Sequence, residues 1–196
     1  MKKSIIVIIV LAVLVGIIFL WYQSVYNGLV KADEEVKAQW GNVENQYQRR
    51  TDLIPNLVAT VKGYAQHEQS TLQGVIEARA KATQVTIDPT NLNEQTMAQF
   101  QQVQGELSSA LSRLLVSVEA YPDLKANQNF LDLQAQLEQT ENRISTERTR
   151  FNNVAQSYNT LVRKFPNNLI ANLSGFTQKP YFKAEAGAEK APEVQF

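Results

Sequence analysis

The sequence contains no cysteine and a single histidine, His67. Disulfide bridges and thiolate chemistry are therefore excluded. A zinc-protease helix needs a second histidine four residues after the first, and that position holds Thr71. No second histidine is present to activate a serine or lysine nucleophile. The sequence therefore predicts no catalytic residue, no metal and no cofactor, and we expect a protein that is not an enzyme.

An excess of either charge is also missing. The chain of 196 residues has 19 basic and 19 acidic side chains, which are interspersed and give a net charge of zero. Without a basic stripe we expect no nucleic-acid partner, and no acidic tract indicates a solvating tail. Beyond the first 22 residues, roughly 170 remain, which is enough for one domain with a hydrophobic core.

Charge is absent altogether from residues 4–22, which are almost entirely apolar. About 20 such residues are needed to cross roughly 30 Å of hydrocarbon. Trp21 and Tyr22 end the run, where aromatic rings prefer the headgroup layer, and Lys2 and Lys3 precede it. We predict that residues 1–22 are a retained single-pass anchor with these four residues at the membrane interfaces. A cleaved secretory signal is the alternative, but no small-residue cleavage pattern follows the run.

The basic residues near this run bear on the orientation of the anchor. Lys2 and Lys3 lie directly before it, whereas the first basic residue after it is Lys31. This asymmetry favours an N-terminus inside the cell and a soluble domain outside the cytoplasm. It disappears when the window is widened to include Lys37, so the orientation stays open.

Apolar residues at alternating spacings of three and four predict four helices, at about 23–51, 56–86, 94–120 and 127–165. Asp52 and Pro55 suit a helix boundary, and Pro122 and Pro166 stop the third and fourth helices. Short connections make sequential helices antiparallel neighbours. We predict an all-α, up-down-up-down four-helix bundle over residues 23–166, with long helices and coiled-coil-like packing.

The buried faces are read from the same spacing. They comprise Val25, Leu29, Ala32, Val36, Trp40, Val43 and Tyr47 in the first helix and Val58, Val61, Ala65, Leu72, Val75 and Ala82 in the second. In the third they are Met97, Phe100, Gln104, Leu107, Leu111, Leu114, Val118 and Tyr121, and in the fourth Phe130, Leu133, Leu137, Thr140, Ile144, Glu147, Phe151, Val154, Tyr158, Leu161 and Phe165. Polar members of the predicted faces are Glu68, Arg79, Gln104, Thr140 and Glu147. They either turn to water at the bundle edge or form a buried polar layer that fixes helix register.

The chain after Pro166 divides into two parts. Residues 167–183 include Leu169, Leu173, Phe176 and Phe182 and are too apolar for a free tail, so we expect them to pack on the bundle or on a neighbouring subunit. Residues 184–196 are rich in Ala, Glu and Lys without periodicity, and we expect them to be disordered.

Several stretches resemble the LemA family of bacterial membrane-anchored proteins. Two are specific: Arg-Arg-x-Asp-Leu-Ile-Pro-Asn-Leu at residues 49–57 and Tyr-Pro-Asp-Leu-Lys-Ala-Asn at 121–127. Shorter matching pieces lie at 26–30, 61–68, 140–142, 150–152, 158–159 and 165–166, and the last dozen residues carry none. The resemblance implies an N-terminal anchor, a four-helix bundle and a place in the bacterial inner membrane, and it supplies no reaction.

In an up-and-down bundle the two specific stretches meet at the end farthest from the membrane. We predict a partner-binding surface at this tip, formed by Arg49, Arg50, Asp52, Asn56, Asp123, Lys125, Asn127 and Asn129. Helix ends and turns also favour such residues for capping alone, which is the competing explanation.

Three functions compete. The first is a non-enzymatic, membrane-anchored scaffold or adaptor of the cell envelope that self-associates and binds a protein partner. The second is an envelope sensor that binds a ligand in a bundle core around Glu68, Arg79 and Glu147. The third is a metal enzyme built on Glu68 and Glu147, which the lack of Glu-x-x-His pairs disfavours.

Overall fold

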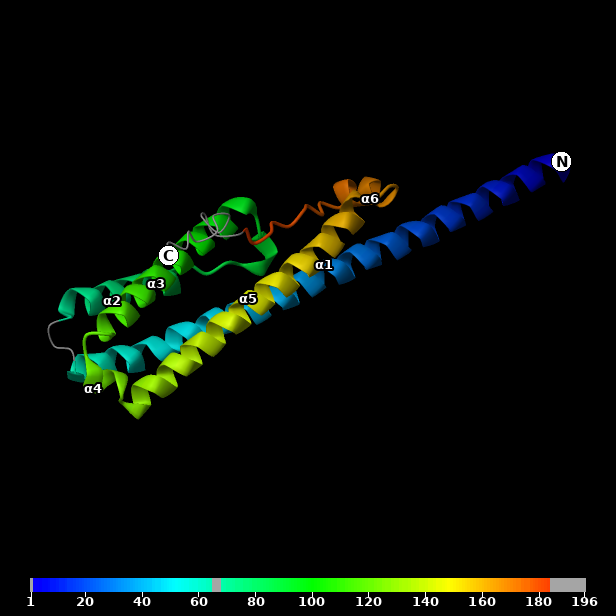
Figure 1. The fold of residues 1–196 in the computed structure, drawn as a ribbon. Coiled ribbons are helices and arrows are strands. Elements are labelled where there is room, and N and C mark those ends of the chain that lie inside the picture. Colours follow the sequence, from blue (N-terminus) through cyan, green and yellow to red (C-terminus); the bar gives the residue numbers. More distant parts are fainter. Residues whose placement is uncertain (1, 65–67, 184–196) are drawn as a thin grey trace, which may run out of the picture.

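The computed structural model describes residues 2–64 and 68–183 (Figure 1). Those residues form helices and connections, with no strand among them, so the all-helical prediction is confirmed. His67 and the predicted disordered segment 184–196 lie outside the described residues. The elements are α1 (Lys2–Tyr64), α2 (Gln69–Gln84), the 3-10 helix η1 (Pro89–Asn91), α3 (Glu94–Val118), α4 (Pro122–Lys125), α5 (Gln128–Arg163) and α6 (Asn167–Leu173).

A single helix carries both the apolar run and the first helix of the soluble part. The 63 residues of α1 correspond to a rod of about 95 Å at 1.5 Å per residue. Its N-terminal part projects beyond the rest of the molecule (Figure 1). The large apolar side chains from Ile5 to Leu20 are exposed there. By length and composition α1 could cross a membrane.

The remaining helices pack against the second half of α1. α5 returns antiparallel along α1, α2 and α3 pack on each other as a hairpin, and α4 turns the chain from α3 into α5 (Figure 1). The closest helix pairs are thus α1 with α5 and α2 with α3. A groove opens between α3 and α5, and a closed four-helix bundle stays a prediction.

The core consists of two apolar clusters in succession along α1. The one nearer the N-terminus is centred on Trp40, which stacks on Phe182 and makes edge contacts with Phe100 and Phe151. The other joins α1 from Ile54 onward to α2, α3 and the first turns of α5. On the faces predicted for the first, third and fourth helices, every residue but one is buried or half-buried, whereas the clusters also contain residues that the pattern missed, such as Ile54, Leu57 and Ala155.

Phe165 is the exception to that pattern. The predicted face of the fourth helix includes it, but α5 ends at Arg163 and the Phe165 side chain is 75% exposed. The repeat continues in the sequence beyond the last residue whose backbone is helical, so its final member does not face the core.

The prediction that the first helix ends near Thr51 is wrong, because α1 continues through Pro55 to Tyr64. A proline within a helix has no N–H for the carbonyl four residues earlier, here that of Thr51. In this structure Arg79 Nε of α2 donates to the Thr51 carbonyl at 2.9 Å. The arginine thus replaces the missing helical donor, and the second predicted helix begins at Gln69 instead of residue 56.

The chain after α6 lies in an extended conformation along α5. Asn159 Nδ2 donates to the Lys179 carbonyl (2.9 Å) and its Oδ1 accepts from the Lys179 N–H (2.8 Å). Asn152 makes the same two bonds with Phe182, at 3.0 and 2.8 Å. These paired bonds bring the Phe182 ring into the Trp40 cluster, where it is buried.

Candidate functional site: a buried arginine beneath a groove

Arg50 is the most deeply buried charged residue in the described chain, with only 1% of its surface exposed. It lies one turn after Tyr47 and one turn before Ile54, on the face of α1 that is buried between Leu29 and Val61. The two apolar clusters meet at this level, since Tyr47 belongs to one and Ile54 to the other. A charged side chain therefore occupies an inward-facing position in the middle of the core.

The guanidinium of Arg50 joins three helices through hydrogen bonds. Nη1 donates to Glu141 Oε1 of α5 (2.7 Å) and to Ser108 Oγ of α3 (2.8 Å). Nη2 donates to Gln104 Oε1 (2.6 Å) and to the Gln104 carbonyl (3.3 Å). The carbon of the guanidinium lies 5.1 Å from the Tyr47 ring centroid. A buried charge is tolerated only with such pairing, and removing one partner of the network is costly.

The network is incomplete at one atom and open to solvent at another. The Nε of Arg50 is buried and has no hydrogen-bond partner among the described residues. The carboxylate of Glu141 is 44% exposed, so it faces both the arginine and solvent. Arg50 is thus at the bottom of a polar layer whose outer edge is open to water.

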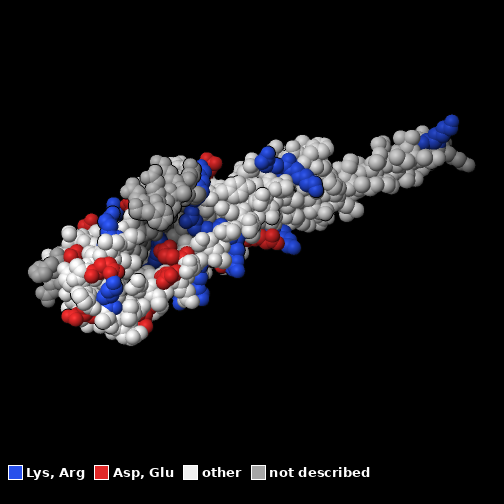
Figure 2. All heavy atoms as spheres, viewed as in Figure 1, with Lys and Arg blue, Asp and Glu red and all other residues white. Residues whose placement is uncertain are grey.

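That outer edge is a groove of about 420 Å³ between α3 and α5. Figure 2 shows a hollow on this face in which acidic and basic side chains lie together. The lining side chains include three cations, Arg50, Arg148 and Lys183, against the single carboxylate of Glu141. The other lining residues are mostly small or amidic: Tyr47, Ala98, Gln101, Gln102, Gln104, Gly105, Ser108, Ser109 and Ile144. Such a lining suits a polar or acidic segment that offers hydrogen-bond acceptors.

A second buried ionic cluster ties the extended C-terminal segment to α1. Lys179 Nζ lies 2.8 Å from Asp33 Oδ1 and 5.5 Å from the Tyr158 ring centroid. Burial acts to raise the pKa of the Asp33 carboxyl, but the hydrogen bonds and charges of Lys179 and Lys37 outweigh it and hold that pKa below its usual value. Burial and the charge of Asp33 raise the pKa of the Tyr158 hydroxyl to about 12.

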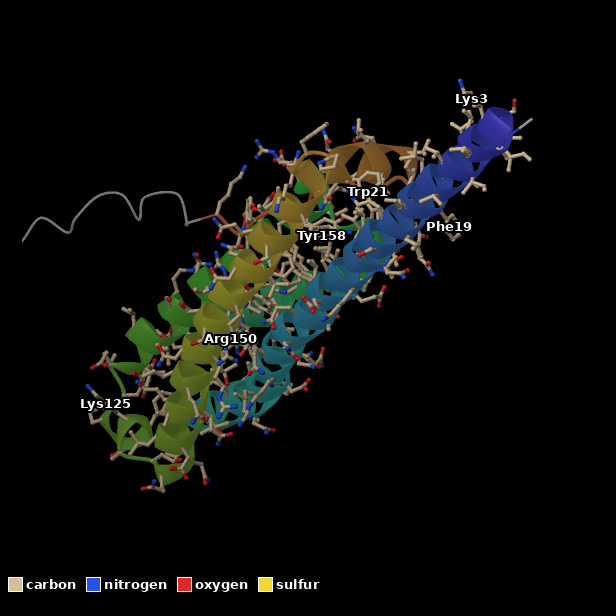
Figure 3. All side chains as sticks on the ribbon, turned by 90° about the vertical axis from the view of Figure 1, so that its right-hand side faces the viewer. Lys3, Phe19, Trp21, Lys125, Arg150 and Tyr158 are labelled. Atoms are coloured by element: carbon tan, nitrogen blue, oxygen red, sulfur yellow. The ribbon has the colours of Figure 1, made fainter. Side chains whose placement is uncertain are left out.

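The residues predicted to form a distal tip are divided by the structure. Arg49, Asp52 and Asn56 are exposed within the continuous helix α1, before its end, and Arg50 is in the core. Their predicted place at a helix end is wrong because Pro55 does not end the helix. Asp123, Lys125, Asn127 and Asn129 do lie at the end opposite the N-terminus, and Figure 3 shows Lys125 far from Lys3.

The polar groups at that distal end bond to one another. Asn127 accepts from the Phe130 N–H as the cap of α5 (3.1 Å) and donates to the Tyr64 hydroxyl (2.8 Å). The Tyr121 hydroxyl donates to Glu68 (3.2 Å), and Lys125 pairs with Glu119. These contacts are explained by the capping of α5 and by bonds that join Tyr64 and Glu68 to the connection between α3 and α5.

The polar residues predicted within the helix faces lie in different surroundings. Gln104 and Thr140 are buried at the level of Arg50, whereas Glu68, Arg79 and Glu147 are half-buried. Glu147 accepts from Gln39 Nε2 (2.7 Å) and from Arg150 Nη1 (2.7 Å). Glu68 bonds to Tyr121 and Arg79 to the Thr51 carbonyl. None of the three residues of the predicted ligand core lines the groove.

The predicted membrane-interface residues are placed along the projecting rod. Lys3 is exposed at its N-terminal end and Trp21 lies where the rod meets the body (Figure 3). The ring of Tyr22 stacks on that of Tyr26 at 6.2 Å between centroids. The side chain of Lys2 lies outside the described part of the structure.

The sequence contained the signal for Arg50, although the prediction placed it at the tip. The buried face of the first helix steps by three and four up to Tyr47, and two further steps give Arg50 and Ile54. The expected helix end at Thr51 stopped that count one turn short. Within residues 2–64 and 68–183, no group of His, Asp or Glu side chains is placed to hold a metal ion.

In the part of the chain that the structure describes, a long apolar N-terminal helix continues into an all-helical body, which defines a helical protein with one candidate membrane span there. The chain belongs to the LemA family, whose sequence profile matches residues 39–196. The match includes the last dozen residues, so the expectation that they carry none of the resemblance is wrong.

The similar proteins include magnetosome proteins and a LemA protein. The chain is 28% identical over 181 residues to magnetosome protein MamQ 2 of Paramagnetospirillum magneticum, which covers 84% of this chain and 66% of that protein. It is 28% identical over 174 residues to MamQ of Magnetospirillum gryphiswaldense, covering 80% and 64%. It is 24% identical over 157 residues to protein LemA of Metamycoplasma hominis, covering 80% and 68%. The chain thus spans slightly less than two thirds of each MamQ protein.

Proposed function

We propose that this protein is a non-enzymatic scaffold or adaptor of the bacterial cell envelope. The apolar part of α1 anchors it in the inner membrane, and the helical body stands on the extracytoplasmic side. A polar or acidic segment of a partner protein binds in the groove between α3 and α5. The observation that carries the proposal is Arg50, a buried cation whose hydrogen-bond network opens into that groove.

The groove is a better candidate for the partner surface than the distal tip. At the tip the polar groups pair with one another, as Tyr64 does with Asn127 and Glu68 with Tyr121. In the groove Arg50 is paired with Glu141, but Arg148 and Lys183 have no acidic partner among the described residues. An unbalanced positive lining favours an acidic segment, and it increases the rate of association as well as the affinity.

Site-specific crosslinking in intact cells tests this proposal. A photoreactive amino acid is introduced at Gln101, which lines the groove, or at the matched control Gln99, which is exposed on the other side of α3. We expect a defined protein adduct from position 101 and none from position 99. Crosslinking at position 101 is then repeated in two variants. Arg148→Ala removes a cation that lines the groove, and Arg150→Ala is a control on the same helix that does not line it.

Loss of the adduct with Arg148→Ala, and its retention with Arg150→Ala, supports an acidic segment in the groove. Equal adducts from positions 99 and 101 would show that the groove has no special role. Neither alternative function is favoured by a specific contact, because Glu68 and Glu147 bond to different partners.

A further inference from the structure

α5 brings the chain back to the level where the apolar run ends. Glu147 of α5 accepts from Gln39 of α1, so these two residues lie at the same height. Arg163 ends α5 sixteen residues later, which places it level with about residue 23 of antiparallel α1. The pair of Arg50 with Glu141 gives a level of about residue 28. The end of α5 therefore lies within a few residues of Trp21 along the rod.

α6 stays at that level. It packs on α1 and α5, and the ring of Phe176, just after it, contacts the ring of Tyr26 with 5.8 Å between centroids. Figure 1 shows α6 beside α1 where the bare rod begins. Tyr26 is five residues from Trp21, or about 8 Å along a helix. The headgroup layer on each side of a bilayer is about 5–8 Å thick.

Three large apolar side chains are exposed at this level. Phe165 is 75% exposed, Leu169 58% and Leu173 80%. Leu169 and Leu173 are four residues apart and share one face of α6, while Ile170 and Ala171 on its other side are buried. The apolar face of α6 is therefore directed away from the protein.

The charges next to this face are all positive. Arg163 and Lys164 directly precede Phe165 and are exposed. No Asp or Glu occurs between Arg163 and Lys183, and none occurs in α1 before Asp33. Exposed apolar side chains beside basic ones, at the height of an aromatic belt, match the surface of a helix that lies in a membrane interface.

We propose that Phe165, Leu169 and Leu173 insert into the headgroup region of the bilayer that α1 crosses, with Arg163 and Lys164 against anionic lipid phosphates. The inference rests on the proposed anchoring of α1. It gives the helical body a second, monotopic contact with lipid. Two contacts restrict the tilt of the rod, and they hold the groove at a fixed height above the membrane.

Spin labels on single cysteines test this directly, since the natural chain has no cysteine. The full-length protein is placed in vesicles of phosphatidylethanolamine and phosphatidylglycerol, with one label each at Leu173→Cys, Val116→Cys or Leu14→Cys. Val116 is a matched control, because it is 72% exposed near the distal end of α3. Collisions with oxygen, which concentrates in lipid, are compared with collisions with a water-soluble nickel chelate.

We expect position 14 to report hydrocarbon, position 116 to report water and position 173 to report an intermediate depth. Position 173 behaving like 116, while 14 reports hydrocarbon, would overturn the proposal and leave the anchor intact. Water at all three positions would reject the anchor and the proposal together. Shielding of 173 from both reagents, with spin–spin broadening, would assign the face to a second copy of the chain and also overturn the proposal.

A second variant separates lipid contact from folding. The double variant Leu169→Ser/Leu173→Ser changes only exposed side chains, so the helix content should not fall. With a label at Phe165→Cys, we expect the double variant to shift that label toward water. Val116→Ser is the control and should leave it unchanged. An unchanged label in the double variant, with helicity retained, would contradict insertion of α6.

Discussion

Arg50 is a charge placed where packing alone would favour an apolar side chain. It separates two apolar clusters and fixes the relative positions of α1, α3 and α5 through bonds to Ser108, Gln104 and Glu141. Long helices with a regular repeat can slide by a turn at little cost, and a buried polar layer disfavours such shifts. The same network supplies the positive floor of the groove.

Replacing Arg50 with methionine should destabilise the helical body. The apolar stem is conserved, but Gln104 Oε1 and Ser108 lose their partner, which costs about 1–3 kcal/mol for a buried acceptor left unpaired. Arg49→Met, at the exposed neighbouring position, should change the stability by less than about 0.5 kcal/mol. Denaturant unfolding followed by circular dichroism measures both. Similar losses for the two variants would contradict the buried network.

Several single residues escaped sequence-based prediction for one common reason. Asp52 and Pro55 predict a helix boundary, and that boundary makes Arg49, Arg50 and Asn56 residues of a distal tip. A contact between α2 and the Thr51 carbonyl removes the boundary. A hydrogen-bond donor that lies 28 residues from the carbonyl it satisfies cannot be predicted from a local pattern.

At the scale of elements, the continuity of α1 depends on a neighbour. Proline in a helix interior removes one hydrogen bond and crowds the preceding turn, at a cost of about 3 kcal/mol or more. Arg79 offsets part of that cost by donating to the Thr51 carbonyl. A helix that sequence would end near residue 51 thus reaches Tyr64.

A double-mutant cycle tests this compensation. Arg79→Met should cost about 1–2 kcal/mol, because it leaves the Thr51 carbonyl without a donor. In a Pro55→Ala background the alanine N–H supplies that donor, so the cost should fall by at least about 0.5 kcal/mol. Lys81→Met on the same helix, whose side chain is exposed, serves as the control. Additive effects of Arg79→Met and Pro55→Ala would show that the two residues act independently.

The extended segment before residue 184 should loosen in acid. The folded-state pKa of Asp33 lies below its usual value near 3.8, so its contribution to stability is complete above that value. It is lost as the pH falls through the lowered pKa and the pair with Lys179 is neutralised. Hydrogen exchange of the Lys179 and Phe182 amides reports the change, since Asn159 and Asn152 accept from them.

The comparison with Asp33→Asn makes this prediction specific. Above about pH 4 the wild-type amides should be better protected than those of the variant, after correction for intrinsic exchange. Below the lowered pKa of Asp33 the two proteins should converge. A constant difference between them at all pH values would assign the protection to the asparagine contacts alone.

At the scale of the whole molecule, the anchored rod has a near and a far end. The α2–α3 connection does not reach the near end as an up-and-down bundle would suggest, since Ile87 and Leu92 pack in the cluster of Trp40. Trp40 is 19 residues beyond Trp21, or about 28 Å. Among the described residues, α1, α5, α6 and the segment around Phe176 therefore come closest to the proposed membrane surface.

Orientation and self-association stay predictions that one set of proteins can test. A cysteine at Val116 is placed in the otherwise cysteine-free chain. We expect a membrane-impermeant maleimide to label it in intact cells, because the body is proposed to lie outside the cytoplasm. Labelling only after the cells are opened would show the opposite orientation.

Self-association is tested by mass photometry of the detergent-extracted protein. The particles should have a multiple of the 22.1 kDa mass of the chain, and a monomer alone would reject self-association.

The sequence by itself determined the helical class, the apolar run and most of the buried faces. These follow from the periods of local structure, in which Trp40, Leu107 and Phe151 fall on regular steps of three and four. Tertiary structure decided that α1 continues through Pro55 and which side chains pair with Arg50 in the core. The reason is physical, because each of these outcomes depends on contacts between helices distant in sequence, such as Arg79 with Thr51 and Arg50 with Glu141, and such contacts have no local period.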